Sequence, residues 1–205
     1  MLKIHSRLVS LFFYELQSKE IQVQIEEQTS VPFWAMTDWA VYEQALFHIL
    51  QNAVRYSGGF GQIKLSTSFV DMRRATQVRN SQVSVVQLAR VGGDEVDWGY
   101  LITQVSDTGG GISAHEFNKI KFTFHRLAGE ANAEAKDGAG SGLPVAASLA
   151  VLLGGALSVS TKPFDGTTVT LIAQVRSREV VHSLQSLSVS TLKLREELGH
   201  GNLVI

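Results

Sequence analysis

The sequence predicts an α+β fold, a two-layer α/β sandwich in which helices cover one face of a mixed, mostly antiparallel sheet. Two observations support this prediction. Segments with apolar residues at helical spacing are interspersed with segments in which apolar and polar residues alternate. These segments do not follow the regular strand–helix–strand order that builds a parallel sheet. With 205 residues, 44% of them hydrophobic, the chain can bury one sizeable core.

The N-terminal part contains a predicted strand between two predicted helices. Residues 3–19 are expected to be helical, because apolar residues recur at helical spacing and neither Pro nor Gly interrupts them. In residues 21–26, Ile and Val alternate with Gln and Glu, which predicts a strand with one buried face. The second helix is predicted to begin at Thr37 or Asp38, which supplies a capping oxygen, and to end near Ser57, before two glycines.

The middle of the chain is rich in strand patterns. Residues 62–70 and 82–91 are predicted to pair as a hairpin around the polar segment 71–81. Residues 100–106 form a further predicted strand, and a short helix is expected near residues 114–121.

The C-terminal part contains one more helix and a final hairpin. Residues 143–153 predict a helix closed by two glycines, and residues 156–161 and 167–175 predict the two strands of the hairpin. We therefore expect one domain over residues 1–175, followed by a C-terminal tail or linker helix over residues 176–205.

The composition argues against several classes of partner. Lys and Arg total 18 against 19 for Asp and Glu, so the charge balance favours neither a nucleic acid nor a membrane surface. The chain has no Cys, which excludes disulfides and thiolate metal sites. No apolar run reaches the roughly 18–20 residues that span a bilayer, and a signal-peptide pattern is absent from the N-terminus. We expect no membrane contact by this segment and a cytoplasmic location, on the intracellular side if the full protein is tethered to a membrane.

The second predicted helix has a polar stripe in addition to its apolar one. His48, Asn52 and Tyr56 are spaced by four residues and share one side of the helix, with Arg55 at its flank. A carboxamide oxygen is a ligand suited to Mg²⁺, and a guanidinium offers donors to phosphate. The alternative is an ordinary solvated helix face.

An acidic residue followed by glycines ends the strand at residues 100–106. Asp107 could accept a hydrogen bond from an exocyclic amine such as that of adenine, while Gly109 and Gly111 permit close backbone approach. A simple strand-ending turn is the alternative.

A second glycine motif leads directly into a helix. Gly138, Gly140 and Gly142 precede Leu143, so backbone N–H groups and the helix N-terminus could hold phosphate oxygens. No Gly-Lys-Ser/Thr follows, so this is not a Walker loop. A flexible linker before the helix is the alternative.

Together, the order and spacing of these motifs resemble the ATP-binding catalytic domain of sensor histidine kinases. These domains belong to the GHKL or Bergerat-fold superfamily, which includes gyrase, the heat-shock chaperone ATPases and MutL. Residues 52–57 are similar to the family's Asn box, 107–112 to its first glycine box, 120–126 to its aromatic box and 138–143 to its second glycine box. The resemblance covers roughly residues 3–175.

The resemblance implies roles for individual residues. Asn52 would hold Mg²⁺ on the ATP triphosphate, with His48 a possible further ligand, and Arg55 would lie close to the phosphates. Asp107 would recognise the adenine amino group, and Thr167 would reach adenine through water. Other residues implied at the nucleotide site are Tyr56, Gly109, Gly111, Ile112, Phe124, Arg126, Gly138, Gly140, Gly142 and Leu143. Residues 122–140 would form a mobile lid.

The implied activity is that of a histidine protein kinase with ATP and Mg²⁺ as cofactors. It transfers the ATP γ-phosphoryl group to a histidine on a separate dimerisation domain, mainly by positioning and charge neutralisation. The implied catalytic residues are His48, Asn52, Arg55 and Arg126, and the implied partners are that dimerisation domain and a response-regulator receiver domain. No phosphoacceptor motif precedes the Asn box, so we expect an excised catalytic domain or one that acts on another chain.

One departure from the family leaves other functions open. His48 stands where most histidine kinases carry Asn and where related hydrolases often carry a Glu general base. The imidazole could act as a base or weak metal ligand, or it could be a tolerated polar substitution. The alternatives to a kinase are therefore an ATPase of the same fold and a degenerate nucleotide-binding module.

Overall fold

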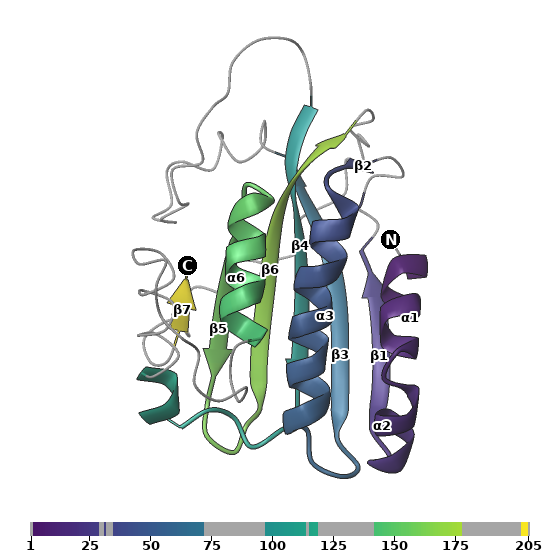
Figure 1. Cartoon of the computed structure of the whole chain (residues 1–205), viewed down its shortest axis with the longest axis vertical. Helices are drawn as coiled ribbons and strands as arrows, with labels where there is room; N and C mark the ends of the chain where they lie inside the picture. The colour runs from purple at the N-terminus through teal and green to yellow at the C-terminus, as the bar shows by residue number, and fades with distance from the viewer. Residues whose placement is uncertain are drawn as a thin grey trace.

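The computed structural model describes residues 2–28, 31, 35–71, 97–113, 115–118, 142–177 and 202–204. These residues form one seven-stranded sheet with helices packed on one face, so the predicted two-layer α+β architecture is confirmed (Figure 1). No helix in these ranges combines the length and the apolar character needed to cross a membrane.

The sheet is mixed and mostly antiparallel. Its strand order is β1 (Gln22–Glu27), β3 (Gln62–Asp71), β4 (Asp97–Asp107), β6 (Thr167–Ser177), β5 (Ala156–Thr161) and β7 (Asn202–Val204), with β2 (Ala35–Met36) paired to the end of β6. The β1–β3 pair is parallel, whereas the other neighbouring strands are antiparallel.

The two central helices begin and end where local signals predict. Asp38 caps helix α3 (Trp39–Tyr56), and its Oδ1 accepts from the N–H groups of Ala40 and Val41 at 3.1 Å each. Helix α6 (Gly142–Leu152) is followed by Gly154, whose φ of +66° favours a residue without Cβ. Both helices lie side by side across the sheet (Figure 1).

The predicted single helix over residues 3–19 is instead two helices, α1 (Leu2–Ser10) and α2 (Phe13–Ser18). Phe12 lies between them with a non-helical backbone (φ −102°, ψ 16°). Its ring is buried and stacks on Phe47 of α3 at a centroid distance of 5.2 Å. The break therefore accompanies a tertiary contact that hydrophobic spacing cannot show.

The sheet differs from the sequence prediction at two places. Strand β3 pairs antiparallel with β4, whereas residues 82–91, its predicted hairpin partner, lie outside the described residues. Strand β6 continues to Ser177, and residues 202–204 of the predicted tail are a strand beside β5. Most of the predicted tail helix, residues 178–201, also lies outside the described part of the chain.

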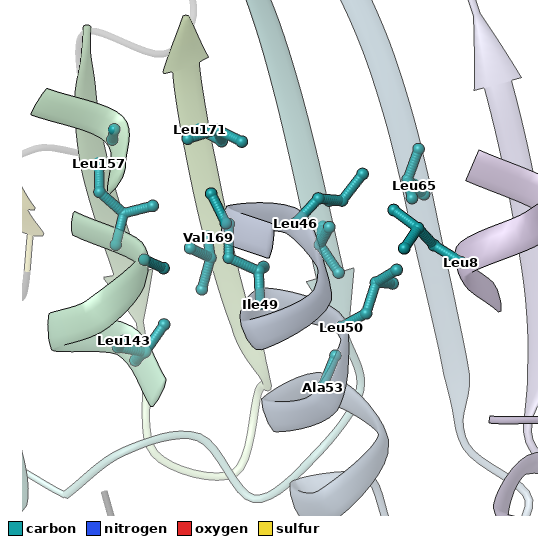
Figure 2. Packing of buried hydrophobic residues seen from close by; sticks show 14 of the residues in the cluster. Leu8, Leu46, Ile49, Leu50, Ala53, Leu65, Leu143, Leu157, Val169 and Leu171 are labelled. Carbon is teal, nitrogen blue, oxygen red and sulfur yellow. The ribbon is translucent and has the colours of Figure 1, made fainter. Parts of the chain in front are cut away.

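The core lies between the helices and the sheet. Figure 2 shows Leu46, Ile49 and Leu50 of α3 packed among side chains from neighbouring elements. These include Leu8 of α1 and Leu171 of β6, so the N-terminal helix belongs to the same core. Burial of these apolar side chains is the main force that holds α3 in place.

A chain of buried polar groups crosses this apolar core. His5 Nε2 lies 3.1 Å from the Tyr42 hydroxyl, which lies 2.7 Å from Thr103 Oγ1, and Thr67 Oγ1 is 3.3 Å further on. All four side chains are buried. Burial lowers the pKa of His5 to about 4, because the charged imidazolium would lose its hydration. His5 is therefore neutral near pH 7.

Candidate functional site

Several of the residues singled out by the sequence, among those that the structure describes, lie at one end of the sheet. The C-terminal end of α3, the end of β4, the beginning of β6 and the start of α6 all lie toward the lower end of the sheet in Figure 1. Asp107 and Thr167 are direct partners in the β4–β6 ladder. Asn52 and Gly142 face each other between the two helices.

Asn52, in the last part of α3, lies next to the start of α6. It is half-buried, and a Cβ built on Gly142 would lie 3.1 Å from its Nδ2 atom. Glycine at position 142 therefore lets the first turn of α6 approach the carboxamide. The N–H groups of Gly142 and Leu143 have no partners within the helix and carry partial positive charge, whereas Pro144 has no N–H.

Tyr56 and Arg55, nearer the end of α3, are more exposed than Asn52. Tyr56 is 57% exposed, and the guanidinium carbon of Arg55 lies 5.6 Å from the centre of its ring. Arg55 is exposed as well, so its donors are free to reach an anionic ligand at this end of the helix.

Asp107 presents a partly buried carboxylate at the end of β4. Its Oδ1 accepts the N–H of Gly109 at 2.9 Å. Burial raises the pKa of Asp107, while hydrogen bonds from the backbone amides of Gly109 and Thr167 oppose that rise by stabilising the ionised form. An additional amine donor would act in the same direction as these amides.

The glycines after Asp107 are needed for backbone packing. A Cβ on Gly109 would lie 2.6 Å from the Tyr56 carbonyl oxygen. Gly111 has φ +68°, and its Cβ would overlap the Lys162 carbonyl oxygen. The glycine loop is therefore held between the end of α3 and the loop that joins β5 to β6.

Gly166 takes part in the same packing and was not among the predicted site residues. It has φ +83°, and a Cβ there would overlap the Asp107 carbonyl oxygen. The only sequence signal for this role is its place in the turn before β6.

The other predicted residues contribute in different ways. Ile112 donates its N–H to Thr161 Oγ1 at 2.8 Å, and that oxygen lies 3.1 Å from Thr167 Oγ1. Leu143 is buried in the hydrophobic core. Phe124, Arg126, Gly138 and Gly140, like the rest of the predicted lid over residues 122–140, lie outside the described residues.

His48 lies one helical turn before Asn52. It is half-buried, burial lowers its pKa, and its Nδ1 is buried and has no hydrogen-bond partner among the described residues. Its ring packs edge-on against Phe47 at 5.8 Å. No carboxylate in the described ranges orients this imidazole.

Lys19 is a contributor that sequence reasoning missed. Its Nζ donates to the carbonyl oxygens of Val54, Arg55 and Ser57 at 2.8, 3.0 and 3.3 Å. The last carbonyl groups of a helix lack partners within the helix and carry partial negative charge, so an ammonium group there is stabilising. Lys19 thus holds the last turn of α3, and no local pattern connects it to residues 35 or more positions away.

We predict that Lys19→Met lowers the melting temperature, because the loss of a helix-end cation costs about 0.3–2 kcal/mol. It should also weaken ADP binding several-fold, because the end of α3 beside the proposed site is then held less firmly. Differential scanning fluorimetry and calorimetric titration would measure the two effects. Lys19→Arg should retain most of both properties. Lys64→Met, which removes an exposed ion pair with Glu26, is the matched control. Unchanged ADP affinity in Lys19→Met would contradict a role for Lys19 in positioning the end of α3.

The chemistry of the described residues is suited to a nucleotide with bound Mg²⁺. Asn52 offers a hard oxygen ligand, and Asp107 offers acceptor capacity beyond its backbone hydrogen bonds. Among the described residues, no group of three or more His, Asp or Glu side chains could hold a metal ion without further ligands.

Comparisons with known proteins agree with this arrangement. Residues 37–177 match the family model described as histidine kinase-, DNA gyrase B- and HSP90-like ATPase. The aerobic respiration control sensor protein ArcB of Escherichia coli K12 is 27% identical over 164 residues, which cover 80% of this chain and 18% of ArcB. The chain thus spans less than a fifth of the length of this curated relative.

Solved structures share the fold. Full-length ShkA in complex with AMPPNP is 21% identical, with a TM-score of 0.58 over 85% of this chain and 30% of ShkA. The mycobacterial sensor histidine kinase MprB is 18% identical, with a TM-score of 0.53 over 86% of this chain and 95% of MprB. Because the family model matches more than half of the sequence and the fold agrees, the chain belongs to the family of histidine kinase-, DNA gyrase B- and HSP90-like ATPases.

Proposed function

We propose that this chain is the ATP-binding catalytic domain of a sensor histidine kinase, which transfers the ATP γ-phosphoryl group to a histidine on a separate dimerisation domain. The observation that carries the proposal is the convergence of Asn52, Asp107 and the start of α6 at one end of the sheet. The likeness to the sensor protein ArcB and to histidine kinase structures supports a kinase over the other branches of the family.

In this proposal Asp107 recognises adenine. A carboxylate can accept about four hydrogen bonds, so the amides of Gly109 and Thr167 leave capacity for the exocyclic amine. The partly buried position of Asp107 strengthens such a bond. Thr167 is the direct partner of Asp107 in the β4–β6 ladder, and its Oγ1 would reach the base through a water molecule.

The phosphates would lie toward α6. Mg²⁺ usually binds proteins through one or two side chains and takes its other ligands from phosphate and water, and Asn52 would supply one such ligand. Bound Mg²⁺ would neutralise charge on the triphosphate. The N–H groups of Gly142 and Leu143, with Arg55 and the lid residue Arg126, would hold the phosphate oxygens. A receiver domain would then accept the phosphoryl group from the dimerisation domain.

The direct test is a phosphotransfer assay. The chain is incubated with γ-labelled ATP, Mg²⁺ and a purified dimerisation domain that carries the acceptor histidine. We expect label on that domain, sensitive to acid, and none when the acceptor histidine is replaced by Gln. Asn52→Ala should abolish transfer while ADP still binds through Asp107. Saturable ATP binding without transfer to any acceptor would instead support a degenerate nucleotide-binding module.

The hydrolase alternative rests on His48, and we predict that it fails. A positioned general base contributes about 10²–10⁴-fold to a rate, yet no residue in the described part of the chain bonds to the Nδ1 of His48 and orients the ring. We expect the isolated chain to release phosphate more slowly than about one turnover per minute, and His48→Asn to change that rate by less than about tenfold. A coupled phosphate-release assay measures both. Turnover within seconds that His48→Asn removes would establish the hydrolase.

A further inference from the structure

At the end of the sheet away from Asn52, one side of β6 has a short gap between its neighbouring strands, which we call the notch. Strand β5 pairs with β6 as far as Ile172, and β2 resumes the pairing at Arg176. Between them, the Gln174 N–H donates to the Leu153 carbonyl at 2.9 Å and the Gln174 carbonyl accepts from the Thr37 hydroxyl at 3.1 Å. The backbone of the notch is therefore satisfied, and beside it opens a hollow of about 420 Å³.

One side chain that lines the hollow, that of Arg176, is a cation held in a fixed orientation. The guanidinium of Arg176 lies over the indole ring of Trp98, 4.3 Å from its centre, and the two residues are direct partners in the β4–β6 ladder. Within the described ranges, Arg176 makes no ion pair. Stacking on an aromatic ring restrains a guanidinium and leaves its in-plane N–H donors available for bidentate contact with a carboxylate.

Two further features restrict the chemistry of a ligand. Met36 and Leu152, which also line the hollow, are 64% and 75% exposed and offer apolar surface. Asp38 is the acidic residue of the lining, and its Oδ1 is engaged with the first turn of α3. Its negative charge disfavours a polyanion such as a triphosphate or a nucleic acid. The lining thus suits one carboxylate next to an aliphatic group.

We propose that the hollow beside this notch binds an extended segment of a partner protein in which an acidic residue adjoins an aliphatic one. The carboxylate pairs with Arg176, and the aliphatic side chain packs against Met36 and Leu152. A volume near 420 Å³ holds a few side chains. From Asp38 to Asn52 helix α3 rises about 21 Å, so a segment bound here leaves the proposed nucleotide site open.

The test uses a matched pair of peptides and no nucleotide, so its outcome is independent of the proposed kinase activity. N-acetyl-Leu-Glu-Leu-amide and N-acetyl-Leu-Gln-Leu-amide are titrated into isotope-labelled protein, and the Trp98 indole N–H signal, assigned with Trp98→Phe, is followed by NMR. We expect saturable shifts with the Glu peptide and at least roughly tenfold weaker binding of the Gln peptide, because charge-assisted hydrogen bonds are about twice as strong as neutral ones.

Variants of the cation give a second measurement. Arg176→Gln should lose the preference for the Glu peptide, Arg176→Lys should keep only part of it, and Arg7→Gln, at an exposed arginine of α1, should keep all of it. Equal binding of both peptides, or no saturable shift with either, overturns the proposal. The same shifts on raising protein concentration without peptide would assign the notch to a second copy of the chain and overturn it too.

Discussion

Asp107→Asn is expected to weaken ADP binding by about 10- to 100-fold. A buried hydrogen bond to a charged acceptor contributes about 1.5–3 kcal/mol, and each 1.4 kcal/mol is about tenfold in affinity. Asparagine also presents an NH₂ group where the adenine amine needs an acceptor, so a donor would face a donor. Isothermal titration with ADP would measure the change.

The neighbouring loop supplies the control for this substitution. Asp165 is exposed and forms an ion pair with Lys162, so Asp165→Asn removes an equal charge from the loop between β5 and β6. We expect that variant to bind ADP as the parent does. ADP affinity that is equal in the parent and in Asp107→Asn would show that Asp107 does not recognise the base.

The second large effect is a pH dependence of folding stability that originates at His5. An unfolded histidine titrates near pH 6.5, whereas burial lowers the pKa of folded His5 to about 4. Between these values the unfolded state binds more protons, so the free energy of unfolding falls as pH decreases from about 6.5 to about 4. The difference between the two pKa values corresponds to about 3 kcal/mol. Above this window the contribution of neutral His5 is fully present.

His5→Gln keeps a polar side chain beside Tyr42 but removes the titrating group. The free energy of unfolding of this variant should therefore depend less on pH in the window where His5 titrates. Urea unfolding of the parent and variant from pH 7 to pH 4 would measure the difference. Asp107 changes the free energy of unfolding in the opposite direction as pH decreases, because burial raises its pKa. Its contribution is the same in both proteins and cancels when they are compared. His115→Gln, at an exposed histidine, controls for the loss of a histidine as such. Parallel curves for parent and His5→Gln would contradict the assignment.

Elements with strong local signals were predictable from the sequence. Helix α3 begins at the Asp38 cap and ends before a pair of glycines, and α6 ends at Gly154, because capping and positive φ involve neighbouring residues only. The final hairpin follows from the same kind of signal. Hydrophobic spacing could not show the break at Phe12, because that break accompanies a contact with Phe47 on another helix.

The candidate site divides in a similar way. The sequence singled out Asn52, Asp107 and Gly142 by residue type and by their place at the ends of predicted elements. It could not show that Lys19 holds the end of α3 or that Gly166 packs on Asp107. These contacts join segments that are far apart along the chain, and neither has a period or a motif.

By itself, then, the sequence determined the fold class, the limits of the two central helices and the residue types available for nucleotide chemistry. Only the tertiary structure decided that the end of α3, the glycine loop and the start of α6 meet at one end of the sheet. It alone also showed the buried His5–Tyr42 pair and the stacking of Arg176 on Trp98 at the opposite end of the sheet. The physical reason is that caps, turns and periodicity depend on residues a few positions apart, whereas close packing and the pairing of buried polar groups depend on which distant segments the core brings together.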